Sequence, residues 1–118
     1  MDEQATAVDI ARAFTQAWTS QNMEAAASYI ADDVVFDGPL GHVEGVAAYL
    51  EGLKGLSRSL GVSGVSVLAA FGDEAQVLIM YDLLTEKAGP LTCAKLLSFD
   101  NGKIKTDRLT FDSYQVRK

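Results

Sequence analysis

Cysteine and histidine are almost absent from this sequence, which has one of each among 118 residues, Cys93 and His42. A single cysteine cannot form an intramolecular disulfide. One cysteine and one histidine also cannot supply the ligand set of a typical zinc site. We therefore expect neither a disulfide-stabilised fold nor a metal site.

Basic residues are also few. Ten Lys and Arg stand against sixteen Asp and Glu, which gives a formal net charge of -6 and a pI of about 4.6. The basic residues are scattered singly, whereas a nucleic-acid-binding protein needs a basic patch or stripe. We expect no nucleic-acid partner.

Long apolar runs are missing as well. None approaches the roughly 18 residues that span a bilayer, and the first ten residues, MDEQATAVDI, lack the basic and apolar regions of a secretory signal. The composition, 48% hydrophobic and 22% charged, is typical of a globular protein. No repeat or linker divides the sequence. We expect one domain over residues 1–118, in the cytoplasm and without a membrane partner.

The first half of the chain has helical periodicity. Apolar residues recur at spacings of four, three and four at Ala7, Ala11, Phe14 and Trp18, which predicts a first helix. A second helix is predicted over 23–30 with Asn22 as its N-cap, and a third over about 46–60. Between them, residues 34–36 are β-branched or aromatic and predict a short strand, and 38–41 a loop.

The second half predicts strands. Residues 62–71 and 75–84 form one expected hairpin, and residues 91–99 and 103–111 form another. Helices followed by a meander of strands are typical of the α+β class. The predicted architecture is therefore three N-terminal helices on a mostly antiparallel sheet.

The turn of the last hairpin has two alternatives, which place different residues opposite each other. A two-residue turn at 101–102 would set Cys93 opposite Thr110. A three-residue loop that ends in a left-handed Gly102 would set Cys93 opposite Leu109, apolar against apolar. Because a one-residue slip moves every side chain to the other face, the hydrophobic match favours the three-residue loop.

The favoured register places two opposite charges among apolar residues. Lys95 would lie directly across from Asp107, on the face that also carries Leu97 and Leu109. Lys and Asp are almost never fully buried unless they are paired. In one interpretation, Lys95 holds an anionic or carbonyl group and Asp107 transfers a proton. In the other, the two form a cross-strand ion pair at the rim of the sheet, worth a few tenths of a kcal/mol.

Of four further residues, two have alternative interpretations. Asp37, at a strand end, is either a general base at a pocket mouth or a turn residue that bonds its own backbone. His42, in a Gly-flanked loop, is either a lid or proton shuttle or a solvated side chain. Tyr81 shares a strand face with apolar residues and should face the core or a pocket. Cys93 is expected to be an inert buried thiol.

Two stretches of the sequence resemble a known family. FTQAWTSQNMEAAASYIADDVVFDGPLG (14–41), followed by Glu44-Gly45, and the ending FDNGKIKTDRLTFDS (99–113) resemble the nuclear transport factor 2-like superfamily. Within it, the SnoaL-like polyketide cyclases and the ketosteroid isomerases are the most similar. The resemblance implies a cone-shaped fold in which three helices pack against a strongly curved sheet around a deep pocket. It also implies a homodimer through the outer face of the sheet.

The isomerase residues do not carry over to this sequence. The position of the oxyanion tyrosine falls on Phe14, and the supporting tyrosines fall on Ile30 and Leu53. The protonated aspartate falls on Lys95, and the catalytic aspartate falls on Asp37 or on the glycine that follows it. Because an oxyanion hole needs hydrogen-bond donors, this isomerase mechanism is not expected. The resemblance nevertheless implies that Lys95 and Asp107 line the pocket.

These arguments together predict a function. We expect a small, largely apolar organic ligand in the pocket, with acid–base chemistry such as isomerisation, cyclisation or dehydration by Asp107, Lys95 and Asp37, and with no cofactor. The residues expected to line the pocket are Phe14, Trp18, Leu53, Tyr81, Leu97 and Leu109. The alternative is a non-catalytic dimerisation or accessory module with a filled pocket, because the strands over 62–84 carry apolar residues on both faces.

Overall fold

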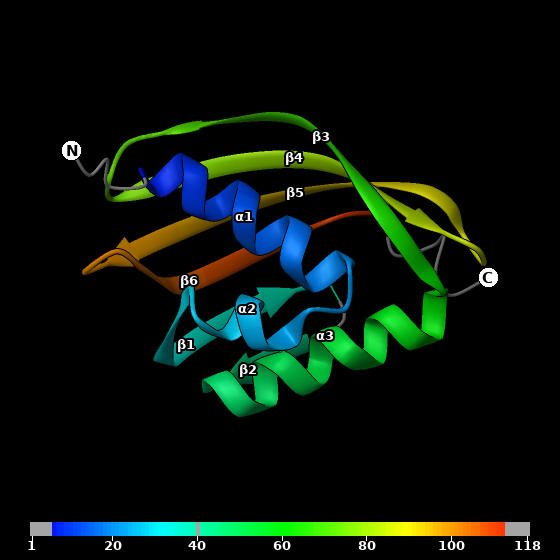
Figure 1. The fold of residues 1–118 in the computed structure, drawn as a ribbon, viewed down its shortest axis with the longest axis horizontal. Helices are drawn as coiled ribbons and strands as arrows, with labels where there is room; N and C mark the ends of the chain where they lie inside the picture. The colour runs from blue at the N-terminus through cyan, green and yellow to red at the C-terminus, as the bar shows by residue number, and fades with distance from the viewer. Residues whose placement is uncertain (1–5, 40, 113–118) are drawn as a thin grey trace.

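The structure is a computed structural model and describes residues 6–39 and 41–112. Its helices are α1 (Ala7–Thr19), α2 (Met23–Ala27) and α3 (Val46–Leu60). Its strands are β1 (Ile30–Gly38), β2 (Gly41–Glu44), β3 (Val62–Gly72), β4 (Gln76–Thr85), β5 (Gly89–Asp100) and β6 (Lys103–Thr110). One six-stranded sheet has the order β2-β1-β6-β5-β4-β3 (Figure 1). The predicted α+β class, with helices on a curved and mostly antiparallel sheet, is confirmed.

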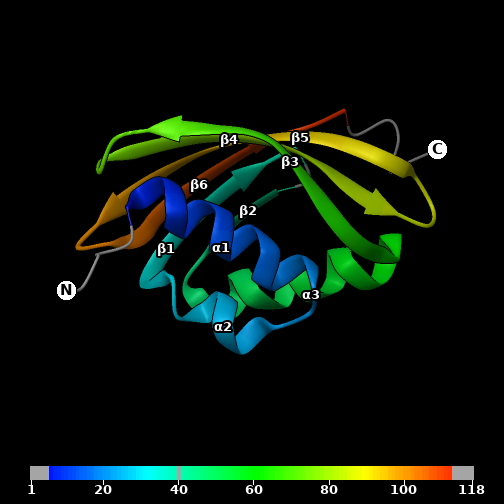
Figure 2. The same ribbon diagram turned by 45° about the horizontal axis from the view of Figure 1, so that its top comes forward.

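The helices cover the concave face of the sheet, which arches over them in Figure 2. Every strand pair is antiparallel except β1–β6, which is parallel. Irregularities in β3, between Val62 and Gly64 and between Val67 and Ala69, interrupt its pairing with β4. Such bulges bend a strand and increase its twist. The curvature leaves room between the sheet and the helices.

Local sequence signals explain where the helices begin and end. Thr6 caps α1 in a capping box with Asp9, and the Asn22 side chain caps α2 by accepting from the Ala25 N–H at 3.1 Å. The third helix spans the predicted residues and ends at Gly61, whose φ of 66° is left-handed. The predicted extension of the second helix to Ile30 is wrong. Ile30 begins β1 and is buried beside β6.

The last hairpin has the two-residue turn, so the predicted three-residue loop is wrong. Asn101 and Gly102 both have positive φ, 53° and 76°, as a type I′ turn requires, and Asp100 pairs with Lys103. A bulge at Lys105 then shifts the register by one residue. The bulge restores the hydrophobic match that a regular two-residue hairpin would have lost.

The bulge also changes the partners of the two charged residues. Lys95 pairs with Leu109, and Leu97 pairs with Asp107. Lys95 and Asp107 are therefore diagonal neighbours on one face and not directly opposite, as the sequence had suggested. A long lysine side chain can reach a diagonal neighbour.

Residues 41–44 form a strand, although the sequence predicted a loop there. In this short strand, β2, His42 pairs with Asp37 of β1. The predicted strand over 34–36 is likewise longer, because β1 pairs with β6 on one side and β2 on the other. Over the described residues, no helix is long and apolar enough to cross a membrane.

Candidate functional site

A cavity of about 210 Å³ lies between the helices and the inner face of the sheet. Its wall is mainly apolar. Trp18 of α1, Leu53 and Leu56 of α3, and Leu83, Leu91 and Phe111 from the sheet side contribute to it. These residues lie on the apolar faces that the periodicity of the helices and strands places inward.

Polar groups gather at one part of this wall. Tyr49 of α3 and Lys95 of β5 line the cavity, and Asp107 of β6 lies beside both of them. The Lys95 Nζ donates to Asp107 Oδ2 at 2.9 Å, and the Tyr49 hydroxyl donates to the same oxygen. Lys95 Nζ also lies 3.5 Å from the Tyr49 hydroxyl. The Tyr49–Asp107–Lys95 triad joins one helix and two strands.

The triad is removed from water. Lys95 and Asp107 are each 1% exposed, and Tyr49 is 2% exposed. Two aromatic rings lie near the ammonium, whose Nζ is 5.2 Å from the Phe14 ring centroid and 5.7 Å from that of Trp18. At these distances the ring faces attract a cation. The ion pair is therefore fully desolvated, and the interpretation as a rim pair does not apply.

Burial sets the protonation of the neighbouring groups. Loss of water, followed by the nearby charge of Asp107, raises the pKa of Tyr49 well above its ordinary value. Burial likewise raises the pKa of Tyr81 well above its ordinary value, and raises that of Cys93 to about 11. Tyr49 is thus a neutral hydrogen-bond donor, and Cys93 is a protonated thiol with little nucleophilicity.

Two buried side-chain polar atoms have no hydrogen-bond partner among the described residues: Asp107 Oδ1 and Trp18 Nε1. Such groups are rare in folded proteins, because each one loses its bond to water without a replacement. Both belong to residues at or directly behind the polar part of the cavity wall. This part of the core is therefore less stable than it would be with every polar atom hydrogen-bonded, which is common at functional sites.

The expected pocket residues divide into two groups. Trp18, Leu53, Tyr81 and Leu109 line the cavity. Phe14 and Leu97 are fully buried, but neither is among the described residues that form the wall. Asp107 also lies behind the wall and meets the cavity only through its two partners.

Tyr49 was missed as a polar site residue. In the sequence it is one member of the apolar stripe of the third helix, which predicts only that it faces the core. The signal that could have identified it is the pairing rule for buried charges. A carboxylate buried beside a lysine needs further donors, and Tyr49 is the tyrosine of the inward face of that helix.

Asp37 does not join the triad. Its strand neighbour Phe36 lines the cavity, as does Val43 opposite Phe36, so the alternation of side chains directs Asp37 and His42 to the outer face of the sheet. The side chains of Asp37 and His42 are 54% and 52% exposed. The structure therefore places the Asp37 side chain on the outer face, and Asp37 is not among the described residues that line the cavity.

His42 binds two carboxylates on this outer face. Its Nδ1 lies 2.6 Å from Asp37 Oδ1, and its Nε2 lies 2.9 Å from Glu44 Oε2. These bonds, first to Glu44 and then to Asp37, raise the pKa of His42. In the part of the chain that the structure describes, no group of three or more His, Cys, Asp or Glu side chains could hold a metal ion.

Comparison with protein families gives one match. The model of the SnoaL-like domain matches residues 11–106, which is most of the chain. The chain belongs to the SnoaL-like family. No curated protein sequence matches this SnoaL-like domain.

Solved structures also resemble this chain. A protein from Kribbella flavida DSM 17836 is 32% identical and has a TM-score of 0.86, with 95% of this chain and 91% of that chain covered. A nuclear transport factor 2-like protein from Cytophaga hutchinsonii is 23% identical, with a TM-score of 0.85 and full coverage of both chains. An LEH-like epoxide hydrolase from M. tuberculosis is 20% identical, with a TM-score of 0.76 and coverage of 93% and 85%. The last two show only that the fold is shared.

Proposed function

We propose that this SnoaL-like domain binds a small, largely apolar organic molecule in the cavity. The observation that carries the proposal is that about 210 Å³ stays open in the interior, although bulky side chains surround it. Pockets for drug-sized ligands are commonly about 300–1,000 Å³, so the ligand should be compact. A module without a ligand would fill this space with its aromatic side chains. In this chain Trp18 and Tyr81 form part of the wall instead.

We further propose acid–base chemistry at the polar part of the wall. Lys95 and Tyr49 both line the cavity, and Asp107 anchors the Lys95 ammonium and the Tyr49 hydroxyl as hydrogen-bond donors. Fixed donors in a water-poor site stabilise the negative charge that develops on a carbonyl oxygen when a proton leaves the adjacent carbon. Isomerisation, cyclisation and dehydration all need this step. Such chemistry needs no cofactor.

Binding can be tested with the only tryptophan of the chain, Trp18, as the reporter. Cyclohexylmethanol and cyclohexanecarbaldehyde are compact, uncharged probes of the right size. Either probe should change the fluorescence of Trp18 and the NMR signal of its indole N–H in a saturable manner. Absence of any saturable change with these probes and with a wider panel of small apolar compounds would contradict the proposal.

Two matched variants locate the binding. Leu56 and Leu50 are both half-buried on α3, but only Leu56 is among the described residues of the cavity wall. Leu56→Phe should fill part of the cavity and weaken binding by about tenfold, while Leu50→Phe should leave the dissociation constant within about twofold. Equal effects of the two substitutions would mean that the probes bind elsewhere.

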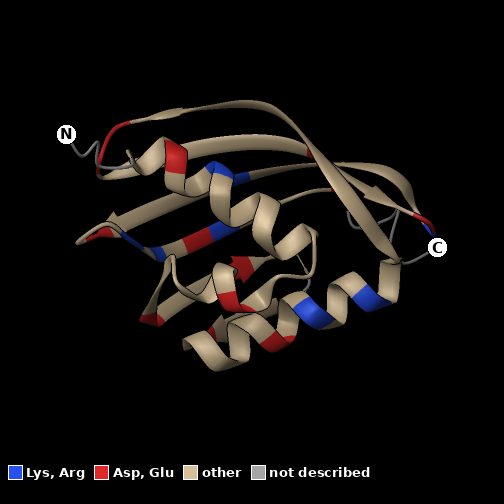
Figure 3. Ribbon diagram, in the orientation of Figure 1, with Lys and Arg blue, Asp and Glu red and all other residues tan. Residues whose placement is uncertain are grey.

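A second proposal concerns the partner of the outer face. We propose a homodimer through this face of the sheet. Phe71 of β3, Leu78 and Met80 of β4 and Leu96 of β5 are between 40% and 62% exposed. Figure 3 shows β3 without any charged segment, in agreement with its sequence. Large exposed apolar patches are typical of interaction sites.

The dimer can be tested by light scattering after size-exclusion chromatography. Leu78 and Leu96 are cross-strand neighbours, so the double change Leu78→Glu, Leu96→Glu places two like charges in the centre of the patch. The unmodified chain should have the mass of a dimer and the double variant that of a monomer. Ser63→Glu, at an exposed site at the start of β3, is the control and should remain dimeric. A monomeric unmodified chain would refute the proposal.

A further inference from the structure

Lys95 has the surroundings of a nucleophilic amine. Its side chain lines an apolar cavity, is 1% exposed, and ends near the rings of Phe14 and Trp18. Lysines that are desolvated in apolar pockets are the ones that act as Schiff-base nucleophiles in enzymes. We propose that Lys95 forms a covalent imine with small carbonyl compounds. This inference rests on the ligand binding proposed above.

The attacking amine must have a free electron pair, and Asp107 can provide it. Its Oδ2 lies 2.9 Å from Lys95 Nζ, so one proton can move between the two atoms without any other rearrangement. The transfer converts an ammonium and a carboxylate into a neutral amine and a neutral acid. Because separated charges are costly in a site shielded from bulk water, the neutral pair is accessible there.

The first step is the addition of the amine to the carbonyl carbon. The Nζ electron pair forms the N–C bond, and the π electrons of the C=O bond move to the oxygen. The Tyr49 hydroxyl, which the geometry places within reach of Nζ at 3.5 Å, gives its proton to that oxygen and takes one from Nζ. The product is a neutral carbinolamine, and Tyr49 is restored.

The second step is the loss of water. The Tyr49 hydroxyl gives its proton to the hydroxyl group of the carbinolamine and takes the proton of Asp107, the C–O bond breaks, and water leaves. The nitrogen electron pair forms the C=N bond, which produces an iminium cation beside the Asp107 carboxylate. The charges are those of the original Lys95–Asp107 pair, so the site that holds the ammonium also suits the iminium.

The ligand class follows from the cavity. It is an aldehyde or a ketone with a compact apolar group, since the rest of the wall offers almost exclusively carbon atoms and the space is about 210 Å³. A charged carbonyl compound would add a net charge to a site in which Lys95 and Asp107 already balance each other, and this is unfavourable in a desolvated interior.

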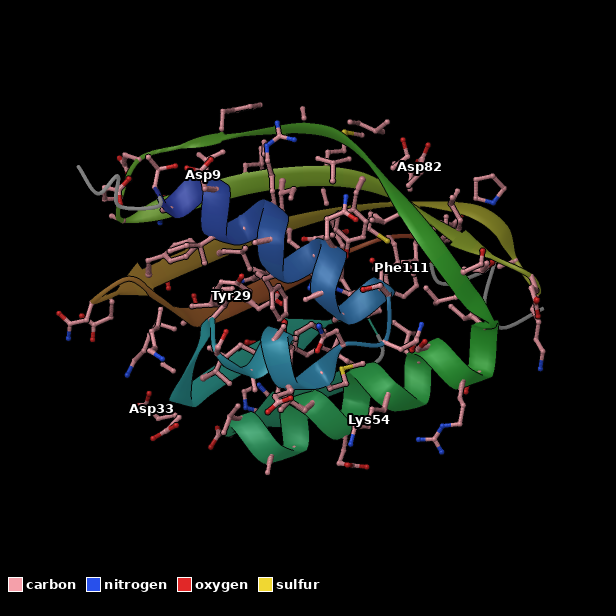
Figure 4. All side chains as sticks on the ribbon, in the orientation of Figure 1. Asp9, Tyr29, Asp33, Lys54, Asp82 and Phe111 are labelled. Atoms are coloured by element: carbon pink, nitrogen blue, oxygen red, sulfur yellow. The ribbon has the colours of Figure 1, made fainter. Side chains whose placement is uncertain are left out.

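Reductive trapping tests the inference. The folded protein is incubated with cyclohexanecarbaldehyde and sodium cyanoborohydride, which reduces the C=N bond to a stable amine, and the labelled lysines are identified by peptide mass spectrometry. Lys54, which projects from α3 away from the sheet, is the internal control (Figure 4). Lys95 should be labelled about tenfold faster than Lys54, because binding holds the carbonyl next to Nζ.

Three controls make the result specific. In guanidinium the ratio of the two labelling rates should fall to about one, since the preference depends on the fold. Excess cyclohexylmethanol should slow the labelling of Lys95 but not that of Lys54. Asp107→Asn should slow the labelling of Lys95 about tenfold, because an amide cannot supply the proton with which water leaves the carbinolamine.

The outcomes separate this inference from the proposed ligand binding. If the aldehyde changes the Trp18 signal but Lys95 is labelled no faster than Lys54, the imine is refuted and binding stands. If neither probe changes the Trp18 signal and Lys95 is not labelled preferentially, both proposals fail. The decisive measurement uses the unmodified chain, so it does not depend on whether the Asp107 variant folds.

Discussion

Removal of the Tyr49 hydroxyl tests how the buried triad is held together. The hydroxyl donates to Asp107 Oδ2, and the other oxygen of that carboxylate has no partner among the described residues. Tyr49→Phe keeps the ring and its contact with Phe14 but leaves Lys95 as the one described donor to Asp107. A hydrogen bond to a charged group is worth about 1.5–3 kcal/mol. We therefore expect the free energy of unfolding to fall by about 2 kcal/mol in urea denaturation at pH 7.

Tyr81→Phe is the matched control for this prediction. Tyr81 is also a fully buried tyrosine in the cavity wall, but its hydroxyl interacts with the Cys93 thiol, which is a weak hydrogen-bonding partner. Its loss should cost less than about 1 kcal/mol. If Tyr49→Phe costs no more than Tyr81→Phe, the Tyr49 hydroxyl does not hold Asp107, and the triad is not a unit stabilised by its hydrogen bonds.

Three further outcomes follow from the structure. Lys95→Met alone should destabilise the fold by about 3–5 kcal/mol, because it leaves the Asp107 charge unpaired. The double variant Lys95→Met, Asp107→Leu should be close to neutral in stability and should lose ligand binding. Loss of folding in the double variant would contradict this prediction. The pKa of His42 is raised in the fold by Glu44 and Asp37. The difference in melting temperature between the unmodified chain and His42→Gln should therefore be fully present below pH ~6.5 and vanish as the pH rises through the raised pKa. A difference that grows with pH would refute the stabilisation of the His42 cation by these carboxylates. The Cys93 thiol, with a pKa of about 11 and 3% exposure, should react with a disulfide reagent far more slowly in the folded than in the unfolded chain, and equal rates would show that the thiol is accessible.

The local elements of the fold could be predicted because short-range signals specify them. The spacing of Ala7, Ala11, Phe14 and Trp18 places the first helix, and Gly61 marks the end of the third. The strand β2 could not be predicted in this way. Its four residues show no apolar alternation, and they are extended because they pair with the edge of β1. The second helix was predicted too long because pairing of Ile30 with β6 overrides its helical surroundings.

The register of the last hairpin shows the limit of pattern arguments. The hydrophobic match correctly predicted which side chains share a face, but it did not reveal how the chain achieves this. The type I′ turn at Asn101-Gly102 and the bulge at Lys105 together have the same effect on the side-chain faces as the predicted loop. Lys95 and Asp107 therefore meet, although the predicted pairing of the two residues was wrong.

The third member of the triad and the position of Asp37 required coordinates for different reasons. Tyr49 contacts Asp107 from α3, although the two residues are 58 positions apart in the sequence, and no periodicity links them. One of the two interpretations of Asp37 was a general base at the pocket mouth, but the alternation of side chains along β1 puts it on the outer face of the sheet. Contacts between distant elements thus decide the chemistry of the site, while local patterns decide only which residues face inward.

The buried triad is difficult to explain by stability alone. Apolar residues of similar volume usually replace a buried ion pair without loss of stability, and this pair leaves one carboxylate oxygen unpartnered among the described residues. The adjoining space of about 210 Å³ also reduces the packing that would offset this cost. A chain selected only for stability, or only for a dimer through the outer face of the sheet, would gain from filling the space and removing the charges. The open space and the buried charges lie at one place in the core, which favours a ligand that contacts both.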